Sequence, residues 1–260
     1  MAMNKLVFLA AILGLLPFST LAQHKPRAAS TPNKASAAPE SSDPIRESDR
    51  LFTHGADAAR DRQALAVIER AVATEGNNYQ LLWRASRLYY FVGDSADKAQ
   101  KLPNFERGIG MGQRSVALEP NSAEGHFWLG ANYGGYSEEK GMIKALQTVK
   151  KIRAEMETVL RLNPGYEEGG AYLALGEMDR QLPGMFGGDN KRAISYLEQG
   201  VRVAPQNMEM KLALAEAYRK AGRRDDARRQ LQEILQMPIN PAHARDNRET
   251  QEKARQLLNK

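Results

Sequence analysis

The sequence has no cysteine among its 260 residues. Disulfide bonds are therefore excluded, and so are zinc sites built on thiolates and a lipid anchor attached to an N-terminal cysteine. The fold must be held together by packing alone. A chain of this length with 42% hydrophobic residues can bury a substantial core.

The pattern of β-strands is also nearly missing. Runs in which Val, Ile or Thr alternate with polar residues between Gly and Pro turns are hard to find. From Asp57 onward, Ala, Leu, Glu, Arg, Lys and Gln dominate. These side chains lose least rotamer freedom in a helix, so the composition predicts an all-α fold.

One apolar run is present, over residues 6–18, and Lys5 precedes it. This run is shorter than the roughly 20 residues that a membrane span needs. The small residues of Thr20-Leu21-Ala22 suit a signal peptidase. We expect residues 1–22 to be a signal peptide, which leaves a periplasmic or secreted protein without a transmembrane span. An uncleaved N-terminal anchor is the alternative.

Residues 23–50 are rich in Ala, Ser and Pro and show no hydrophobic period. Such a segment cannot bury a core, so we predict a disordered linker over 23–50. The helical domain is then expected to span residues 51–260.

A recurrence of turn and packing residues runs through this domain. Four turn positions are each followed by an apolar residue after nine residues and by a small one after ten: Gly76, Pro120, Pro164 and Pro205. In three units a tyrosine follows after thirteen residues, at Tyr89, Tyr133 and Tyr218. This spacing is typical of stacked helical hairpins of the tetratricopeptide (TPR) type. The sequence therefore predicts an α-solenoid that ends in a capping helix over 241–258.

The intervals from Pro120 to Pro164 and from Pro164 to Pro205 exceed the usual TPR unit of about 34 residues. The additional residues fall at 134–144 and 183–189, inside the hairpins, and a further loop is expected over 93–104. Long loops without structure of their own are uncommon unless they function. These segments therefore predict a lid or a mouth on one edge of the stack.

Three groups of motifs stand in the longer repeats. They are Phe127-Trp128-Leu129-Gly130 with Tyr133-Gly134, then Leu162-Asn163-Pro164 with Gly169-Gly170-Ala171-Tyr172 and Leu175-Gly176, then Pro183 with Gly187-Gly188-Asp189. In this order, and with lengthened hairpins, the chain resembles the TRAP transporter T-component (TatT) family over about residues 52–238.

The resemblance implies an extracytoplasmic helical protein that forms a homotrimer and has an apolar ligand channel in each protomer. It further implies association with the substrate-binding protein of a TRAP-type transporter. Family members are often lipoproteins, whereas Gln23 and His24 stand where the lipid-bearing cysteine would be. Membrane attachment is therefore not expected from the resemblance.

The first helices of TPR hairpins line the concave surface of the stack. From the helical period we predict that seven residues face this groove and bind a ligand: Trp83, Arg87, Tyr90, Phe127, Gly134, Ala171 and Leu175. The aromatic members favour a small hydrophobic ligand, and Arg87 could bind the carboxylate of an organic acid. The alternative is that these aromatic residues belong to the core, as Trp128 would if it fills a seam.

Signals for catalysis, metals and nucleic acids are weak. The histidines His24, His54, His126 and His243 have no metal-ligand spacing, and no Ser-His-Asp grouping can be assigned. We therefore predict a protein without catalytic residues, metal or cofactor. The arginines at 223, 224, 228 and 229 are interleaved with acidic residues, which is more typical of a solvated helix face than of a nucleic-acid site.

Glycines and one aspartate have structural interpretations. The glycines at 108, 110 and 112 do not match a dinucleotide-binding motif and are expected to permit close helix contact. Gly169 and Gly170 likewise indicate a close backbone approach to a neighbouring helix or a ligand. Asp189 is expected to cap the helix that follows it, with cation binding as the alternative.

Three functions remain open from the residues. The first is a transport accessory protein that binds a small ligand and passes it to a TRAP-type substrate-binding protein. The second is a TPR scaffold whose concave face binds a peptide or a helix of another protein. The third is a structural oligomer of the cell envelope.

Overall fold

The computed structural model describes residues 43–140, 142–240 and 243–259. Within these ranges it contains eleven α-helices and no strand, which confirms the all-α prediction. The elements are α1 (Pro44–Leu51), α2 (Ala58–Thr74), α3 (Tyr79–Asp94), α4 (Lys98–Leu118), α5 (Ala123–Lys140), α6 (Met142–Leu162), α7 (Tyr166–Gln181), η2 (Gly184–Phe186), α8 (Asn190–Val203), α9 (Met208–Lys220), α10 (Arg224–Gln236) and α11 (Ala244–Leu258).

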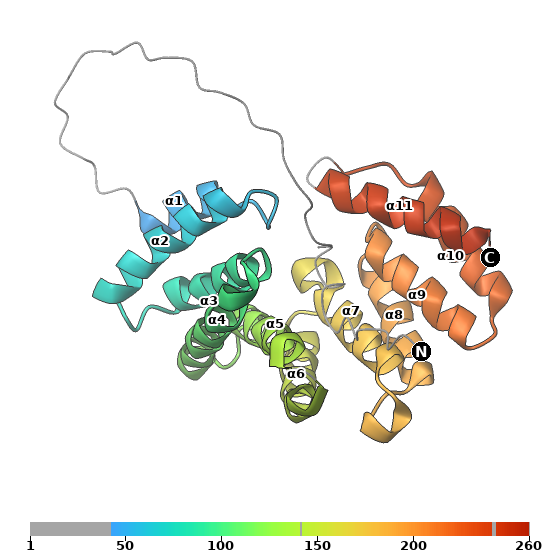
Figure 1. The fold of residues 1–260 in the computed structure, drawn as a ribbon, viewed down its shortest axis with the longest axis horizontal. Helices are drawn as coiled ribbons and strands as arrows, with labels where there is room; N and C mark the ends of the chain where they lie inside the picture. Colours follow the sequence, from blue (N-terminus) through green and yellow to red (C-terminus); the bar gives the residue numbers. More distant parts are fainter. Residues whose placement is uncertain (1–42, 141, 241–242, 260) are drawn as a thin grey trace, which may run out of the picture.

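The helices form a curved stack of antiparallel hairpins (Figure 1). Consecutive helices pack in pairs, α3 with α4, α5 with α6, α7 with α8 and α9 with α10. The first helices of successive hairpins also contact one another, since α3 packs on α5, α5 on α7, α7 on α9 and α9 on α11. This is the arrangement expected of a TPR solenoid, in which each repeat buries its apolar face against its neighbours.

The predicted turn residues mark the ends of the second helices. Helices α2, α4, α6 and α8 end two residues before Gly76, Pro120, Pro164 and Pro205, respectively. A proline cannot donate the backbone hydrogen bond that would continue the helix, which explains the stop in the last three cases. The repeat pattern in the sequence therefore corresponds to real structural units.

Close approach of the helices depends on residues without a side chain. A Cβ atom at Gly112 of α4 would lie 2.9 Å from the Cβ of Leu129 on α5. At Gly170 of α7 a Cβ atom would lie 2.8 Å from the ring of Phe127. Both distances are shorter than packed carbon atoms allow, so glycine is required for α4–α5 and α5–α7 packing. The expected close helix contact is confirmed for Gly112 and Gly170 and also for Gly108, whose Cβ atom would overlap Asn132, but it is wrong for Gly110, where a Cβ atom would meet nothing within 4 Å.

Two of the three predicted loops are wrong. Residues 93–104 contain a connection of only a few residues, because α4 already begins at Lys98. Residues 134–140 continue α5 instead of leaving it, so the longer interval consists mostly of helix. The segment 183–189 is a loop as expected and includes η2. At its end Asp189 caps α8, accepting hydrogen bonds from the backbone N–H groups of Lys191 and Arg192 at 2.8 and 3.2 Å.

The boundary of the helical domain also needs correction. Residues 44–50, predicted as part of the linker, form most of α1, and Asp43 caps this helix through the N–H of Ile45. The predicted signal peptide over 1–22 and the remaining linker up to residue 42 lie outside the described residues. None of the described helices combines the length and hydropathy that a membrane span requires.

Candidate functional site

The seven predicted ligand-binding residues are all buried. Trp83, Arg87 and Tyr90 lie on α3, Phe127 and Gly134 on α5, and Ala171 and Leu175 on α7. Five of them share one hydrophobic core cluster: Trp83, Tyr90, Phe127, Ala171 and Leu175. The helical period thus placed them correctly on neighbouring helices, but the structure packs them as core side chains. Neither of the two pockets described below is lined by any of these residues.

Trp128 lies at the centre of the aromatic part of this core. Its ring centroid is 5.0 Å from that of Phe127, 5.6 Å from Phe91 and 6.0 Å from Tyr90. Its indole N–H donates a hydrogen bond of 2.9 Å to the hydroxyl of Tyr166. Edge-on and tilted aromatic contacts of this kind stabilise a core beyond simple burial. Trp128 therefore fills the seam between α3, α5 and α7.

Arg87 already has a carboxylate partner within the chain. Its Nη2 atom lies 2.7 Å from Oδ1 of Asp49 on α1, which also pairs with Arg84 at 3.0 Å. The Arg87 guanidinium lies 4.1 Å from the centroid of the Phe52 ring and 5.0 Å from that of Trp83. The arginine is therefore not free to receive an organic acid while α1 stays in this position, because α1 supplies that carboxylate.

A polar pocket of about 200 Å³ is lined by residues other than the seven predicted ones. One of its carboxyl groups, that of Glu167, interacts electrostatically with Arg87. We call this pocket the acidic pocket. It lies where the loop before α2 meets the N-terminal ends of α7, α9 and α11 (Figure 1). Its lining consists of His54, Glu167, Glu168, Gln206, Asn207, Met208, Glu209, Asn240, His243, Asp246 and Asn247.

Left-handed backbone conformations gather at this pocket. His54, Glu167 and Glu168 have φ values of 53°, 47° and 49°, and Gly169 follows with 75°. For residues with a Cβ this conformation costs about 1–3 kcal/mol each, and clusters of such strained residues are found at functional sites. The Glu168 carbonyl accepts a hydrogen bond from the Asn207 side chain at 3.2 Å, which helps to hold the irregular start of α7. The strained residues thus present their side chains to one common space.

Burial perturbs the carboxyl groups of the pocket. It raises the pKa of Glu209 to about 8, with a further contribution from the negative charge of Asp246. Burial is also the main cause that raises the pKa of Glu167 and that of Asp246. At neutral pH the Glu209 carboxyl group is therefore mostly protonated and can donate a hydrogen bond, and a cation in the pocket would favour its ionised form.

Two histidines face each other across the same pocket. The ring centroids of His54 and His243 are 6.4 Å apart. Partial burial lowers the pKa of His54, and the charges of Arg87 and His243 act in the same direction, although much of the ring remains exposed. A neutral imidazole can accept a hydrogen bond from a ligand or donate one. Within the described ranges, no group of three or more His, Cys, Asp or Glu side chains is arranged to hold a metal ion.

The sequence interpretation missed this pocket for a physical reason. Its members come from the starts of three helices and one loop that are distant in the chain, and no single period connects them. One signal was present. The helical period of the TPR hairpins places Leu212 on the concave side. Glu209 stands one helical turn before Leu212 and therefore lies on the same face. The pair Glu167-Glu168 immediately before Gly169-Gly170 was a second, weaker signal.

Two family models match the sequence, and each covers more than half of the chain. The model described as TRAP transporter T-component matches residues 113–260. The model described as Regulator of microtubule dynamics protein 1-3 matches residues 44–177. The two matches share residues 113–177 and together span the described helices. No curated protein sequence matches the chain.

Two solved structures are similar to the chain. TTC0263, a thermophilic TPR protein of Thermus thermophilus, is similar with a TM-score of 0.61 and 22% identity, over 83% of this chain and 97% of that one. MamA is similar with a TM-score of 0.49 and 21% identity, over 76% of this chain and 92% of that one. The likeness to TTC0263 shows that the chain has a TPR fold. At this identity it shows the fold alone.

Proposed function

We propose that this chain, which belongs to the TRAP transporter T-component family, is a non-catalytic accessory protein of a TRAP-type uptake system. Over its N-terminal repeats the chain also belongs to the family described as Regulator of microtubule dynamics protein 1-3. It binds a small organic ligand on the concave side of its helical stack and docks the substrate-binding protein of the transporter. It works outside the cytoplasm, as the apolar run at residues 6–18 suggests.

The acidic pocket carries the ligand part of this proposal. Glu209, Glu167 and Asp246 all have raised pKa values because burial disfavours their charged forms. A positively charged group would remove this penalty by pairing with the carboxylates, whereas an anion would increase it. The pocket therefore favours an organic cation or a ligand rich in hydrogen-bond donors. This differs from the hydrophobic or organic-acid ligand that the sequence suggested, and the two can be tested side by side.

The test compares three probes on the purified protein by isothermal titration calorimetry: putrescine as an amine, succinate as an organic acid and octanol as an apolar molecule. We expect putrescine to bind. Because Glu209 must lose its proton to pair with the amine, the affinity should rise by up to about tenfold per pH unit between pH 6 and pH 8, with release of protons. Binding of putrescine that is independent of pH contradicts this assignment, and so does preference for succinate.

Two variants make the test specific. Glu209→Gln preserves the size of the side chain but cannot ionise, so it should weaken putrescine binding and abolish its proton release. Glu252→Gln changes an exposed residue of α11 that does not line the pocket, and it should leave both quantities unchanged. If both variants weaken binding equally, the amine is attracted by overall charge and not by the pocket.

Docking to the transporter is a separate part of the proposal, supported by family membership. We expect the protein to form a complex with a TRAP-type substrate-binding protein and to assemble as a homotrimer. Size-exclusion chromatography with light scattering on the protein alone and on the mixture measures both. A monomeric mass together with no co-elution would exclude this part without affecting the ligand proposal.

A protein-interaction scaffold is the second candidate. The match to Regulator of microtubule dynamics protein 1-3 over α1–α7 favours it, since that region includes the first helices that line the concave face. A scaffold would bind an extended or helical segment of another protein along several repeats. Native mass spectrometry of the protein isolated from its own cells separates the candidates, because one predicts a retained small molecule and the other a retained polypeptide.

A further inference from the structure

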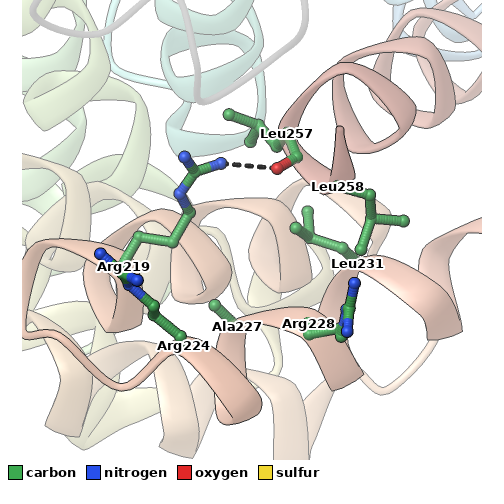
Figure 2. Close-up of a pocket in the computed structure, with 7 residues that line it drawn as sticks. All are labelled: Arg219, Arg224, Ala227, Arg228, Leu231, Leu257 and Leu258. Carbon is green, nitrogen blue, oxygen red and sulfur yellow. Dashed lines mark hydrogen bonds between the residues drawn. The ribbon is translucent and has the colours of Figure 1, made fainter. Parts of the chain in front are cut away.

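A second pocket, distinct from the acidic one, lies at the C-terminal end of the stack. It has a volume of about 300 Å³ and is formed by the end of α9, the first half of α10 and the end of α11 (Figure 2). Its lining consists of Arg219, Arg224, Ala227, Arg228, Leu231, Leu257 and Leu258. We call it the arginine pocket. The acidic pocket uses the opposite end of α11, about 15 Å away along the helix.

The floor of the arginine pocket is apolar. Ala227 and Leu231 are each only 2% exposed and belong to the C-terminal core cluster. Leu257 and Leu258 are half-buried and pack against the same cluster. In Figure 2 the side chains of Leu231 and Leu258 lie close to one another on one side of the pocket. An alkyl group placed there would cover the parts of Leu257 and Leu258 that otherwise face water, which is favourable.

The rim carries three guanidinium groups. Arg219 is held in place because its Nη1 atom donates a hydrogen bond of 2.8 Å to the Leu257 carbonyl (Figure 2). The side chains of Arg224 and Arg228 make no hydrogen bond or ion pair among the described residues. Their neighbours behave differently, since Arg223 and Arg229 both pair with Asp226. The arginines that line the pocket are thus the ones without a carboxylate partner.

The position of these arginines has a cost for the helix. Arg224 is the first residue of α10 and Arg228 lies one turn later. Positive charge at a helix N-terminus opposes the helix dipole, which Asp225 and Asp226 in the same turn complement, whereas an anion there is stabilised. An anionic group bound between Arg224 and Arg228 would offset that repulsion and supply the missing partners. Charge complementarity therefore points to an anion above an apolar floor.

We propose that the arginine pocket binds a carboxylate carried on a short branched alkyl chain. The carboxylate would lie between Arg224 and Arg228, where guanidinium groups can form paired, charge-assisted hydrogen bonds, and the alkyl group would lie on Leu231 and Leu258. The volume suits a group of the size of a leucine residue. Such a group can arrive as the C-terminal residue of a peptide or as a free branched organic acid.

The experiment titrates the full chain with N-acetylleucine and follows the Nε–H signals of its arginine side chains by NMR. We expect signals of Arg224 and Arg228 to shift, with a Kd of about 1 mM for so small a probe. N-acetylleucinamide has the same shape without the charge and should bind about tenfold more weakly. Equal shifts with both compounds would overturn the proposal. So would the absence of any shift with N-acetylleucine at about 10 mM, which is ten times the expected Kd.

Two matched variants test the arginines themselves. Both Arg228→Gln and Arg229→Gln change exposed residues of α10, so folding should be preserved, and only Arg228 lines the pocket. Arg228→Gln should weaken N-acetylleucine binding about tenfold, and Arg229→Gln should leave it unchanged. Equal weakening by both variants would mean general charge attraction and would reject the site.

Two further probes distinguish the source of the carboxylate. If 4-methylpentanoate binds as tightly as N-acetylleucine, the free acid is sufficient. If a tripeptide that ends in leucine binds more tightly than both, a peptide C-terminus is the natural ligand. Inorganic phosphate serves as the anion without an alkyl chain. If phosphate competes as well as 4-methylpentanoate, the leucine floor contributes nothing and the proposal fails. The outcome does not depend on the acidic pocket, since no residue lines both pockets.

Discussion

Replacing Glu209 by glutamine should make the protein more stable at neutral pH, although the substitution touches a polar residue in the proposed ligand pocket. Burial raises the pKa of Glu209 to about 8 in the folded protein, whereas the ordinary value of 4.5 applies after unfolding. Between these values the folded protein binds more protons than the unfolded chain. Its stability therefore falls as the pH rises through this window.

The size of the effect follows from the width of the window. Each pH unit between 4.5 and 8 lowers the free energy of unfolding by about 1.4 kcal/mol. At pH 7 the loss relative to a neutral side chain of the same shape is about 3 kcal/mol. At pH 5 it should be about 1 kcal/mol or less, because this pH lies only slightly above the pKa of 4.5 that applies in the unfolded chain.

Urea denaturation followed by far-ultraviolet circular dichroism at pH 5, 6, 7 and 8 measures this difference directly. Glu209→Gln should gain stability over the native protein as the pH increases. Glu252→Gln, an exposed carboxylate on α11, should stay within about 0.5 kcal/mol of the native protein at every pH. A gap between Glu209→Gln and the native protein that is constant with pH, or a less stable variant at pH 7, would refute the reasoning.

Packing and the N-terminal helix allow further predictions. Gly110→Ala should raise stability by about 0.5–1 kcal/mol, because a Cβ atom there meets no atom within 4 Å and alanine favours the helix. Gly112→Ala should instead lower it by about 1–3 kcal/mol, because its Cβ atom would overlap Leu129; thermal unfolding in the opposite order would argue against the tight α4–α5 seam. Asp49→Asn should speed amide hydrogen exchange of α1 severalfold, because it removes the partner of Arg87. Exchange at the native rate would mean that this pair does not hold α1.

The repeat could be predicted because its signal is local. Gly76, Pro120, Pro164 and Pro205 act on the backbone of their own turns, so their spacing reports helix ends without knowledge of the partners. The loop predicted at 134–144 failed for the opposite reason. Gly134 and Gly135 disfavour an isolated helix, but a Cβ atom at position 135 would overlap the Phe105 ring. Packing against α4 therefore decides the conformation of this segment.

The sequence predicted a cluster of aromatic residues on neighbouring helices but not the acidic pocket. The helical period correctly grouped Trp83, Tyr90 and Phe127, because residues on the same face of neighbouring first helices must meet. It could not show that α1 would place Asp49 against Arg87, since that helix lies in a segment whose composition resembled a linker. Nor could it show the raised pKa of Glu209, which depends on burial by helices distant in the sequence.

The location of the acidic pocket gives it an influence that other positions in a solenoid lack. In a helical-repeat protein each unit contacts mainly its neighbours, so the two ends behave almost independently. Here the curvature of the stack brings the His54 ring, which precedes α2, to the His243 ring, which precedes α11. The carboxyl group of Glu167 on α7 lines the same pocket and interacts electrostatically with Arg87 and with His243. A cation bound at Glu167 and Glu209 would therefore be felt by the first and the last repeat together, and we expect its binding to tighten the whole superhelix instead of one hairpin.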